Sequence, residues 1–167
     1  RQIKSLIRLI EDMLDVSRIR TGKLSIRPTR FDLSERVRNL LQNFAAQIEA
    51  AESSVTLVAE QPVVGNWDEF RIEQVISNLL TNALRYGAKS PITVKVYSER
   101  GEARVEVRDF GIGISEENQH RIFQQFERVT AKHAVAGLGL GLFISEQIVT
   151  AHGGTITVES RIGEGAL

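Results

Sequence analysis

Hydrophobic side chains recur at helical spacing in several separate segments of the chain. The first segment carries a broad apolar stripe with charged residues between its members, which are Ile3, Leu6, Ile7, Ile10, Met13 and Leu14. Later segments keep the same period over lengths that suit helices rather than strands. The pattern predicts helices over residues 1–20, 33–48, 69–86, 116–122 and 140–152.

Other segments alternate apolar and polar residues, which is the period of a half-buried strand. The clearest pair lies on either side of Arg100 and Gly101, and it predicts a hairpin that ends just before Asp109. Shorter alternating segments predict strands at 24–26, 55–59, 63–64 and 155–160. Strands mixed with about three substantial helices indicate an α/β fold, a two-layer sandwich in which helices cover one face of a mixed sheet.

Residues at the segment ends predict where several helices start and stop. Asp32, with Glu35 three residues later, resembles a capping box, and Asp68 is expected to cap the helix that follows it. Gly87 is expected to end that helix in a left-handed conformation. Gly153 and Gly154 are expected to end the last helix.

Composition removes several classes of function. The chain has 167 residues, of which 42% are hydrophobic, so it can bury one proper core. Basic and acidic residues both number 21, which gives no electrostatic reason to expect nucleic acid. The absence of cysteine excludes disulfides and thiolate zinc sites. No apolar run approaches the roughly 20 residues that a membrane helix needs, and no signal-peptide pattern is present, so we expect a soluble domain.

The chain is expected to be a piece of a longer protein with two parts. It begins at Arg1 with an apolar stripe already in progress, and it stops at Leu167 in an apparent loop. A turn at Thr21 and Gly22 separates the first helix from the rest, which predicts one part at 1–22 and another at 23–167. The stripe favours a helix of a bundle or coiled-coil pair, and the alternative is a helix packed on its own domain.

Two asparagines give the first candidate for chemistry. Asn78 and Asn82 are four residues apart, so a helix places both on one face, separate from the apolar one. Their oxygens can bind a hard cation and their amides a phosphate. Asn is a mediocre helix former, and a mid-helix pair costs a few tenths of a kcal/mol each, which indicates a role. The alternative is that both simply face solvent.

Two glycine-rich segments follow. Asp109, Gly111 and Gly113 come after the hairpin, where a carboxylate in an apolar pocket would be costly without a partner; the alternative is an ordinary turn aspartate. The cluster at 137–142 lacks the Lys and Ser or Thr of a P-loop and the spacing of dinucleotide sites. It fits a mobile lid that leads into a helix N-terminus, where free amides favour polyphosphate.

In this order, the asparagine helix, the segment 109–113 and the cluster 137–142 resemble the ATP site of sensor histidine kinases. These kinases belong to the wider class of ATPases that includes gyrase and the heat-shock chaperone of the same fold. The resemblance extends over nearly the whole chain. It implies a catalytic ATP-binding domain at 23–167, with helix 1–22 as the second half of a dimerisation hairpin.

The resemblance also implies roles for individual residues. Asn82 would bind Mg²⁺, Asn78 would be a second polar contact, and Arg85 would bring charge to a phosphate where the family usually has lysine. Asp109 would accept a hydrogen bond from the adenine amino group. The remaining ATP contacts implied are Tyr86, Gly111, Gly113, Ile114, Phe123, Phe126, Arg128, Gly137, Leu138, Gly139, Leu140, Gly141 and Leu142. For Phe123 and Phe126, plain core packing is an equal alternative.

The phosphate acceptor is expected to lie outside this chain. Hydrolysing members of the superfamily carry a glutamate base one turn before the metal asparagine, and here that position is Asn78, which cannot act as a base. This difference favours transfer to a protein nucleophile. None of the three histidines, His120, His133 and His152, is followed by an acidic residue on a suitable helix, so the acceptor histidine is expected on an upstream helix.

These observations predict an ATP- and Mg²⁺-dependent histidine kinase domain of a two-component system. The implied partners are ATP, the upstream phosphoacceptor domain, a response regulator receiver domain and a second copy in the full-length protein, with no nucleic acid. The implied location is the cytoplasm, whether or not the parent protein is membrane-anchored. The alternatives that remain open are a degenerate nucleotide-sensing or scaffold module, an ATP-hydrolysing member of the superfamily and, more narrowly, a serine kinase that shares this site.

Overall fold

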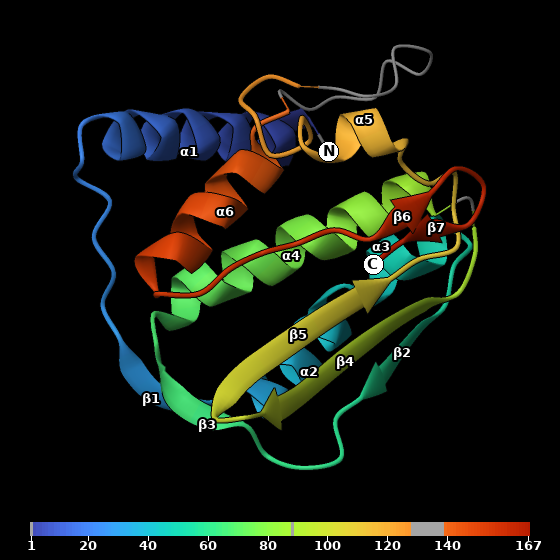
Figure 1. Ribbon diagram of the computed structural model, residues 1–167, viewed down its shortest axis with the longest axis horizontal. Helices are drawn as coiled ribbons and strands as arrows, with labels where there is room; N and C mark the ends of the chain where they lie inside the picture. Colours follow the sequence, from blue (N-terminus) through green and yellow to red (C-terminus); the bar gives the residue numbers. More distant parts are fainter. Residues whose placement is uncertain (1, 88, 128–138) are drawn as a thin grey trace.

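The computed structural model describes residues 2–87, 89–127 and 139–167. Its elements alternate between helices and short strands, as the two hydrophobic periods predict (Figure 1). In chain order they are α1 (Gln2–Arg20), β1 (Thr29–Asp32), α2 (Leu33–Asn43), α3 (Ala45–Ala50), β2 (Val55–Val58), β3 (Val64–Trp67), α4 (Glu69–Tyr86), β4 (Ile92–Glu99), β5 (Glu102–Arg108), α5 (Glu116–Gln119), α6 (Gly141–Ala151), β6 (Ser160–Arg161) and β7 (Gly165–Ala166).

The main sheet is mixed, as predicted. Its strand order is β2-β4-β5, with β2 parallel and β5 antiparallel to β4. The β4–β5 hairpin turns at Arg100 and Gly101, both of which have positive φ, and this turn type matches the twist of the strands that it joins. Two further antiparallel pairs, β1–β3 and β6–β7, lie outside this sheet.

Helices cover one face of the main sheet. Alternate residues of β4, Ile92, Val94 and Val96, are fully buried, and they belong to the same core cluster as Val37 of α2 and Leu80 of α4. Both helices therefore pack against the face of the sheet that these β4 side chains form. The intervening β4 residues are partly or fully exposed, so the opposite face of the sheet is open. The predicted two-layer sandwich is therefore confirmed.

A second apolar cluster joins α4 to two other helices. It comprises Val16 of α1, Val75 of α4, and Leu140, Ile144 and Ile148 at and within α6. Figure 1 shows α6 between α1 and α4. The helix α4 is thus buried on both sides, against the sheet through one face and against α1 and α6 through another.

The structure corrects the prediction of one continuous helix over 33–48. It breaks at Phe44, which ends α2 and precedes α3. Phe44 is half-buried and packs against the main core, whereas no residue of α3 is fully buried. The hydrophobic period continues across Phe44, so the sequence pattern did not show that α2 ends there.

Two predicted strands also differ. Residues 24–26 form no strand, because the pairing begins after Pro28, where β1 meets β3 in the register Asp32 to Val64. The segment 155–160 forms a strand only from Ser160, and its last residues bond to the chain end through reciprocal Glu159 and Leu167 backbone hydrogen bonds. Two or three alternating residues do not specify a pairing partner, and tertiary contacts decided it.

The predicted helix caps have mixed outcomes. The Asp32 side chain accepts hydrogen bonds from the backbone N–H of Ser34 and of Val63, so one carboxylate caps α2 and ties it to β3. Asp68 caps α4 by accepting from Arg71 N. The prediction for Gly87 was wrong: it is right-handed, with φ −73°, and donates to Ala83 O as an ordinary last helical turn. Among the described residues no helix is long and apolar enough to cross a membrane.

Candidate functional site

The helix α4 presents a polar stripe on the side away from the sheet. Residues Arg71, Gln74, Asn78 and Asn82 follow each other at intervals of three or four, so they share that side. The stripe is held in place because Ile76, Leu80 and Ala83 of the same helix are buried in the main core. The direction of the predicted functional asparagines therefore follows from the apolar pattern of the helix.

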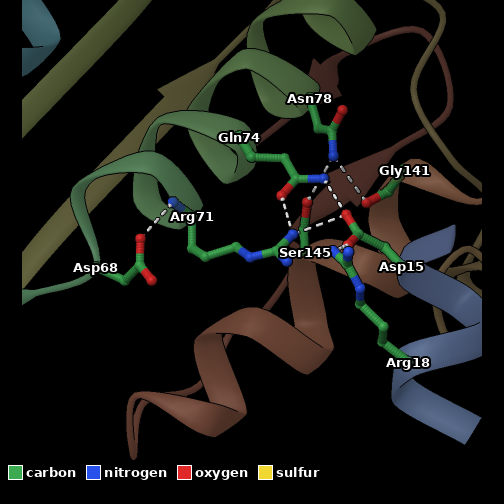
Figure 2. A network of polar contacts seen from close by, with 8 residues as sticks. All are labelled: Asp15, Arg18, Asp68, Arg71, Gln74, Asn78, Gly141 and Ser145. Carbon is green, nitrogen blue, oxygen red and sulfur yellow. Dashed lines mark hydrogen bonds and ion pairs between the residues drawn. The ribbon is translucent and has the colours of Figure 1, made fainter. Parts of the chain in front are cut away.

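Asn78 is buried, with 4% of its surface exposed. Its Nδ2 donates to the carbonyl oxygen of Gly141 at 3.1 Å and to the Oγ of Ser145 at 3.2 Å (Figure 2). The structure thus joins two segments that the sequence predicts to form one site, the asparagine helix and the start of α6. Asn82 lies one turn farther along the stripe and is half-buried.

The C-terminal end of α4 meets the first glycine segment. The carbonyl oxygen of Tyr86 accepts a hydrogen bond from Ile112 N at 3.2 Å. A Cβ on Gly111 would collide with that same carbonyl oxygen, so glycine is required for the close approach. Arg85 is exposed, with its guanidinium carbon 6.0 Å from the Tyr86 ring centroid. Tyr86 itself is half-buried.

Asp109 is 9% exposed and lies directly after β5. Its Oδ1 accepts from Gly111 N at 2.9 Å, and its own backbone N donates to Ala166 O of β7. One carboxylate oxygen thus holds the turn, and the other makes no hydrogen bond with the part of the chain that the structure describes. Gly113 has φ +69° and lies against Arg161, and the adjacent Ile114 N donates to Ser160 Oγ.

The described part of the predicted lid is anchored at both ends. Phe126 N donates to Gly139 O at 3.1 Å, and Gly139 has φ +69°. Leu140 is buried in the cluster of α1, α4 and α6, and Leu142 is half-buried. Phe123 is half-buried and Phe126 is exposed. Arg128, Gly137 and Leu138 lie outside the described residues.

A buried ionic network, which sequence reasoning missed, joins α1 to α4. Asp15 of α1 is 4% exposed and Arg71 is 8% exposed, and their charged atoms Oδ2 and Nη1 are 2.8 Å apart (Figure 2). Gln74 donates to the same Asp15 oxygen at 2.8 Å and accepts from Arg71 at 2.9 Å. Ser145 was also missed. These residues look like ordinary polar positions in the sequence, and only Arg71 and Gln74 offered a signal, their helical spacing with Asn78.

The described side chains could bind Mg²⁺ only together with a nucleotide. Within the described ranges no group of three or more histidine, aspartate or glutamate side chains is arranged to hold a metal ion. Mg²⁺ is commonly held by one or two protein oxygens together with substrate phosphates and water. The amide oxygens of the asparagine stripe fit that pattern, so the residues present are compatible with a magnesium ion that arrives with a nucleotide.

Two other features lie away from this site. A hollow of about 600 Å³ is lined by α2, α3 and β2, including Leu41, Ile48 and Leu57, and none of the predicted site residues lines it. On the open face of the sheet, the Tyr97 hydroxyl donates to Glu106 at 2.6 Å, and this hydrogen bond raises the pKa of Tyr97.

Comparisons with known proteins agree with this arrangement. A family model described as histidine kinase-, DNA gyrase B-, and HSP90-like ATPase matches residues 67–167. The circadian input-output histidine kinase CikA of Synechococcus elongatus is 32% identical over 96% of this chain and 22% of its own length. The chain spans less than a third of the length of the curated relatives that it matches first.

Two solved structures share the fold. The Acinetobacter baumannii histidine kinase AdeS superposes with a TM-score of 0.80 at 26% identity, over 99% of this chain and 77% of that one. The catalytic domain of histidine kinase ThkA gives a TM-score of 0.74 at 29% identity, over 84% of this chain and 91% of that one.

The matched family region contains α4 with its two asparagines, the Asp109 turn and α6, which are the elements that the structure brings together. It covers more than half of the chain. The chain therefore belongs to the family of histidine kinase-, DNA gyrase B- and HSP90-like ATPases.

Proposed function

We propose that this chain is the ATP-binding catalytic domain of a two-component sensor histidine kinase, which transfers the γ-phosphate of ATP to a histidine on an upstream helix. The observation that carries the proposal is the contact between Asn78, in the middle of α4, and the start of α6, with the segment after Asp109 held at the C-terminal end of α4. The names of the similar proteins, all histidine kinases, support the same activity.

ATP would lie between these elements. The free oxygen of Asp109 would accept from the adenine amino group, and Gly111 would let the backbone lie close to the purine. The first amides of α6 have no partner within the helix, so they and the helix dipole favour polyphosphate. Mg²⁺ held with the phosphates by Asn82 would neutralise their charge, and the exposed Arg85 would add a positive charge nearby.

Transfer is a better reading than hydrolysis because of Asn78. The position one turn before Asn82 is the place where a carboxylate base would activate water, and the Asn78 amide cannot remove a proton. Its nitrogen is in addition committed to Gly141 and Ser145. The proposal therefore assigns the site to positioning and charge neutralisation, with a protein nucleophile as the acceptor.

The helix α1 would form one half of a dimerisation hairpin at 1–22. Its exposed apolar residues are Leu6, Ile7, Ile10, Met13 and Leu14, each more than half exposed. A stripe of this size on a single helix is typical of an interface with other helices. The same proposal implies a homodimeric full-length protein, a response regulator receiver domain as the phosphate acceptor downstream, and a cytoplasmic location where ATP is available.

The first test is calorimetric titration of the chain with a non-hydrolysable ATP analogue, with and without Mg²⁺. Magnesium-dependent binding at a 1:1 ratio is expected, and both Asn82→Ala and Asp109→Ala should weaken it at least tenfold. Unchanged affinity in both variants would overturn the assignment of the site. A longer chain that contains the upstream helix should then incorporate phosphate on histidine, whereas release of inorganic phosphate without a phosphohistidine would indicate an ATPase.

A further inference from the structure

The Asn78 side chain is held by two acceptors on one neighbouring helix. Its Nδ2 lies 3.1 Å from the Gly141 carbonyl oxygen and 3.2 Å from Ser145 Oγ, and these two residues are one turn apart on α6. An amide nitrogen carries two hydrogens, so the two acceptors match its donor capacity. Figure 2 shows the nitrogen facing Gly141 and Ser145 and the oxygen turned away from them.

This pair of acceptors fixes which way the amide points. A backbone carbonyl can only accept, so the Asn78 atom that faces Gly141 must be the nitrogen and not the oxygen. The reverse orientation would place two acceptor oxygens against each other in a buried setting, where an unsatisfied polar contact is costly. Asn78 Oδ1 is therefore directed away from α6, on the stripe that also carries Asn82.

Ser145 has no exposed surface, and Ile144 and Ile148 of the same helix belong to the α1–α4–α6 cluster. A hydroxyl is expensive at such a position unless it makes a hydrogen bond, and the Ser145 hydroxyl oxygen accepts one from the Asn78 amide. The Ser145 hydroxyl is therefore buried at a place where its hydrogen bond fixes the orientation of the Asn78 side chain.

We propose that Ser145 is a positioning residue for magnesium–nucleotide binding, which acts by holding the Asn78 amide so that its oxygen faces the Asn82 side of the site. This inference rests on the proposed function. The same two hydrogen bonds fix the first turn of α6 relative to α4, so the helix amides and the asparagine oxygens face a nucleotide in one relative arrangement.

The test compares Ser145→Ala with Ser34→Ala. Ser34 is a matched control, because it is also a buried serine on a helix and its Oγ donates to one backbone oxygen, that of Gln61, at 3.0 Å. Both variants lose one hydroxyl and should lose similar stability. Only Ser145→Ala is expected to weaken Mg²⁺-dependent binding of the ATP analogue, by about fivefold, with binding measured without Mg²⁺ changed much less. Equal affinities for Ser145→Ala and the wild type would overturn the proposal.

A second measurement is independent of nucleotide. In the ¹⁵N spectrum of the free protein, the Asn78 side-chain amide should be shifted from solvent-exposed asparagines and slow to exchange, and Ser145→Ala should move it and speed its exchange, whereas Ser34→Ala should not. An Asn78 amide unaffected by Ser145→Ala would contradict the positioning role. If the wild-type chain bound no nucleotide, the proposed function would fail while this spectrum still decided whether Ser145 orients Asn78.

Discussion

At the residue scale, the two carboxylate oxygens of Asp109 have different roles. Oδ1 accepts from Gly111 N and so holds the turn after β5, while the other oxygen is left for a ligand. The Asp109 side chain is nearly buried. Because only one oxygen holds the turn, a substitution can alter the other oxygen and leave the turn in place. An isosteric substitution is the sharpest way to test this division.

We predict that Asp109→Asn weakens ATP-analogue binding at least tenfold, about 1.4 kcal/mol, without unfolding the domain. The asparagine oxygen can still accept from Gly111 N, but an NH₂ group replaces the second oxygen and cannot accept from the adenine amino group. Calorimetry measures the affinity and thermal unfolding checks that the melting temperature stays within a few degrees. An unchanged affinity for ATP would show that Asp109 does not contact the base.

Glycine is needed for different reasons at different turns of this chain. We predict that Gly111→Ala lowers the free energy of unfolding by about 2 kcal/mol or more, because its Cβ would collide with Tyr86 O and lie 2.6 Å from Gly87 Cα. Gly101→Ala is the control, because Gly101 also lies in a turn but a Cβ there would meet no other atom. Its expected cost is only the backbone strain of φ +81°, about 1 kcal/mol. Urea denaturation measures the free energy of unfolding of both variants. Equal losses would contradict the explanation that the Gly111 substitution is costly because of the steric clash.

Side chains with distinctive chemistry could be found from the sequence, and those without it could not. The two asparagines, Asp109 and the glycines belong to residue types that stand out in their segments, and the structure places Asn78 against Gly141 and Gly111 against the end of α4. Ser145 and Arg71 are ordinary residue types, and their importance comes from partners on other elements, Asn78 and Asp15. Such partners depend on tertiary contact, which no local pattern encodes.

At the element scale, α4 is the helix on which the others depend. One side packs on the sheet through Ile76 and Leu80, another on α6 through Val75, and its first turns bind α1 through Arg71. The network of Asp15, Arg71 and Gln74 fixes where α1 lies along α4 (Figure 2). Buried ion pairs are costly to break, because removing one charge leaves the other without compensation.

We predict that Asp15→Asn lowers the free energy of unfolding by about 3 kcal/mol and speeds amide exchange in α1 more than in the sheet. Arg71 would keep a buried charge with no ionic partner among the described residues, and its contacts with Gln74 and the Phe70 ring are to neutral groups. The control is Arg18→Ala: Arg18 also pairs with Asp15, but at 3.6 Å and with its side chain 55% exposed, so less than about 1 kcal/mol is expected. Similar losses in both variants would show that burial of the pair contributes nothing.

Elements themselves were predictable where the hydrophobic period is long. The eight-residue β4 and the seven-residue β5, with a turn of two positive-φ residues, follow from alternation and turn chemistry. The short segments 24–26 and 155–160 did not give the expected strands, because a few alternating residues are compatible with several pairings. The break at Phe44 was also missed, since α2 and α3 together keep a helical spacing that one straight helix would also show.

At the scale of the whole molecule, one face of α1 is buried and another is exposed. Asp15 and Val16 are buried against α4 and α6, whereas Leu6, Ile7, Ile10, Met13 and Leu14 lie exposed on the remaining surface. Docking on the catalytic part therefore explains only one side of the helix. The outer stripe is apolar enough to need another helix, which the proposed hairpin would supply.

We predict that Ile10→Glu and Leu14→Glu leave nucleotide affinity and stability of this chain nearly unchanged, because both side chains are about half exposed: 51% and 52%. In a longer chain that contains the upstream helix, the same substitutions should convert a dimer to a monomer in light scattering and abolish phosphohistidine formation. Val16→Glu, on the buried face of the same helix, is the control and should instead destabilise the docked helix. A longer chain that stays dimeric with glutamate at both positions would place the dimer interface elsewhere, and α1 would then serve only to cover α4 and α6.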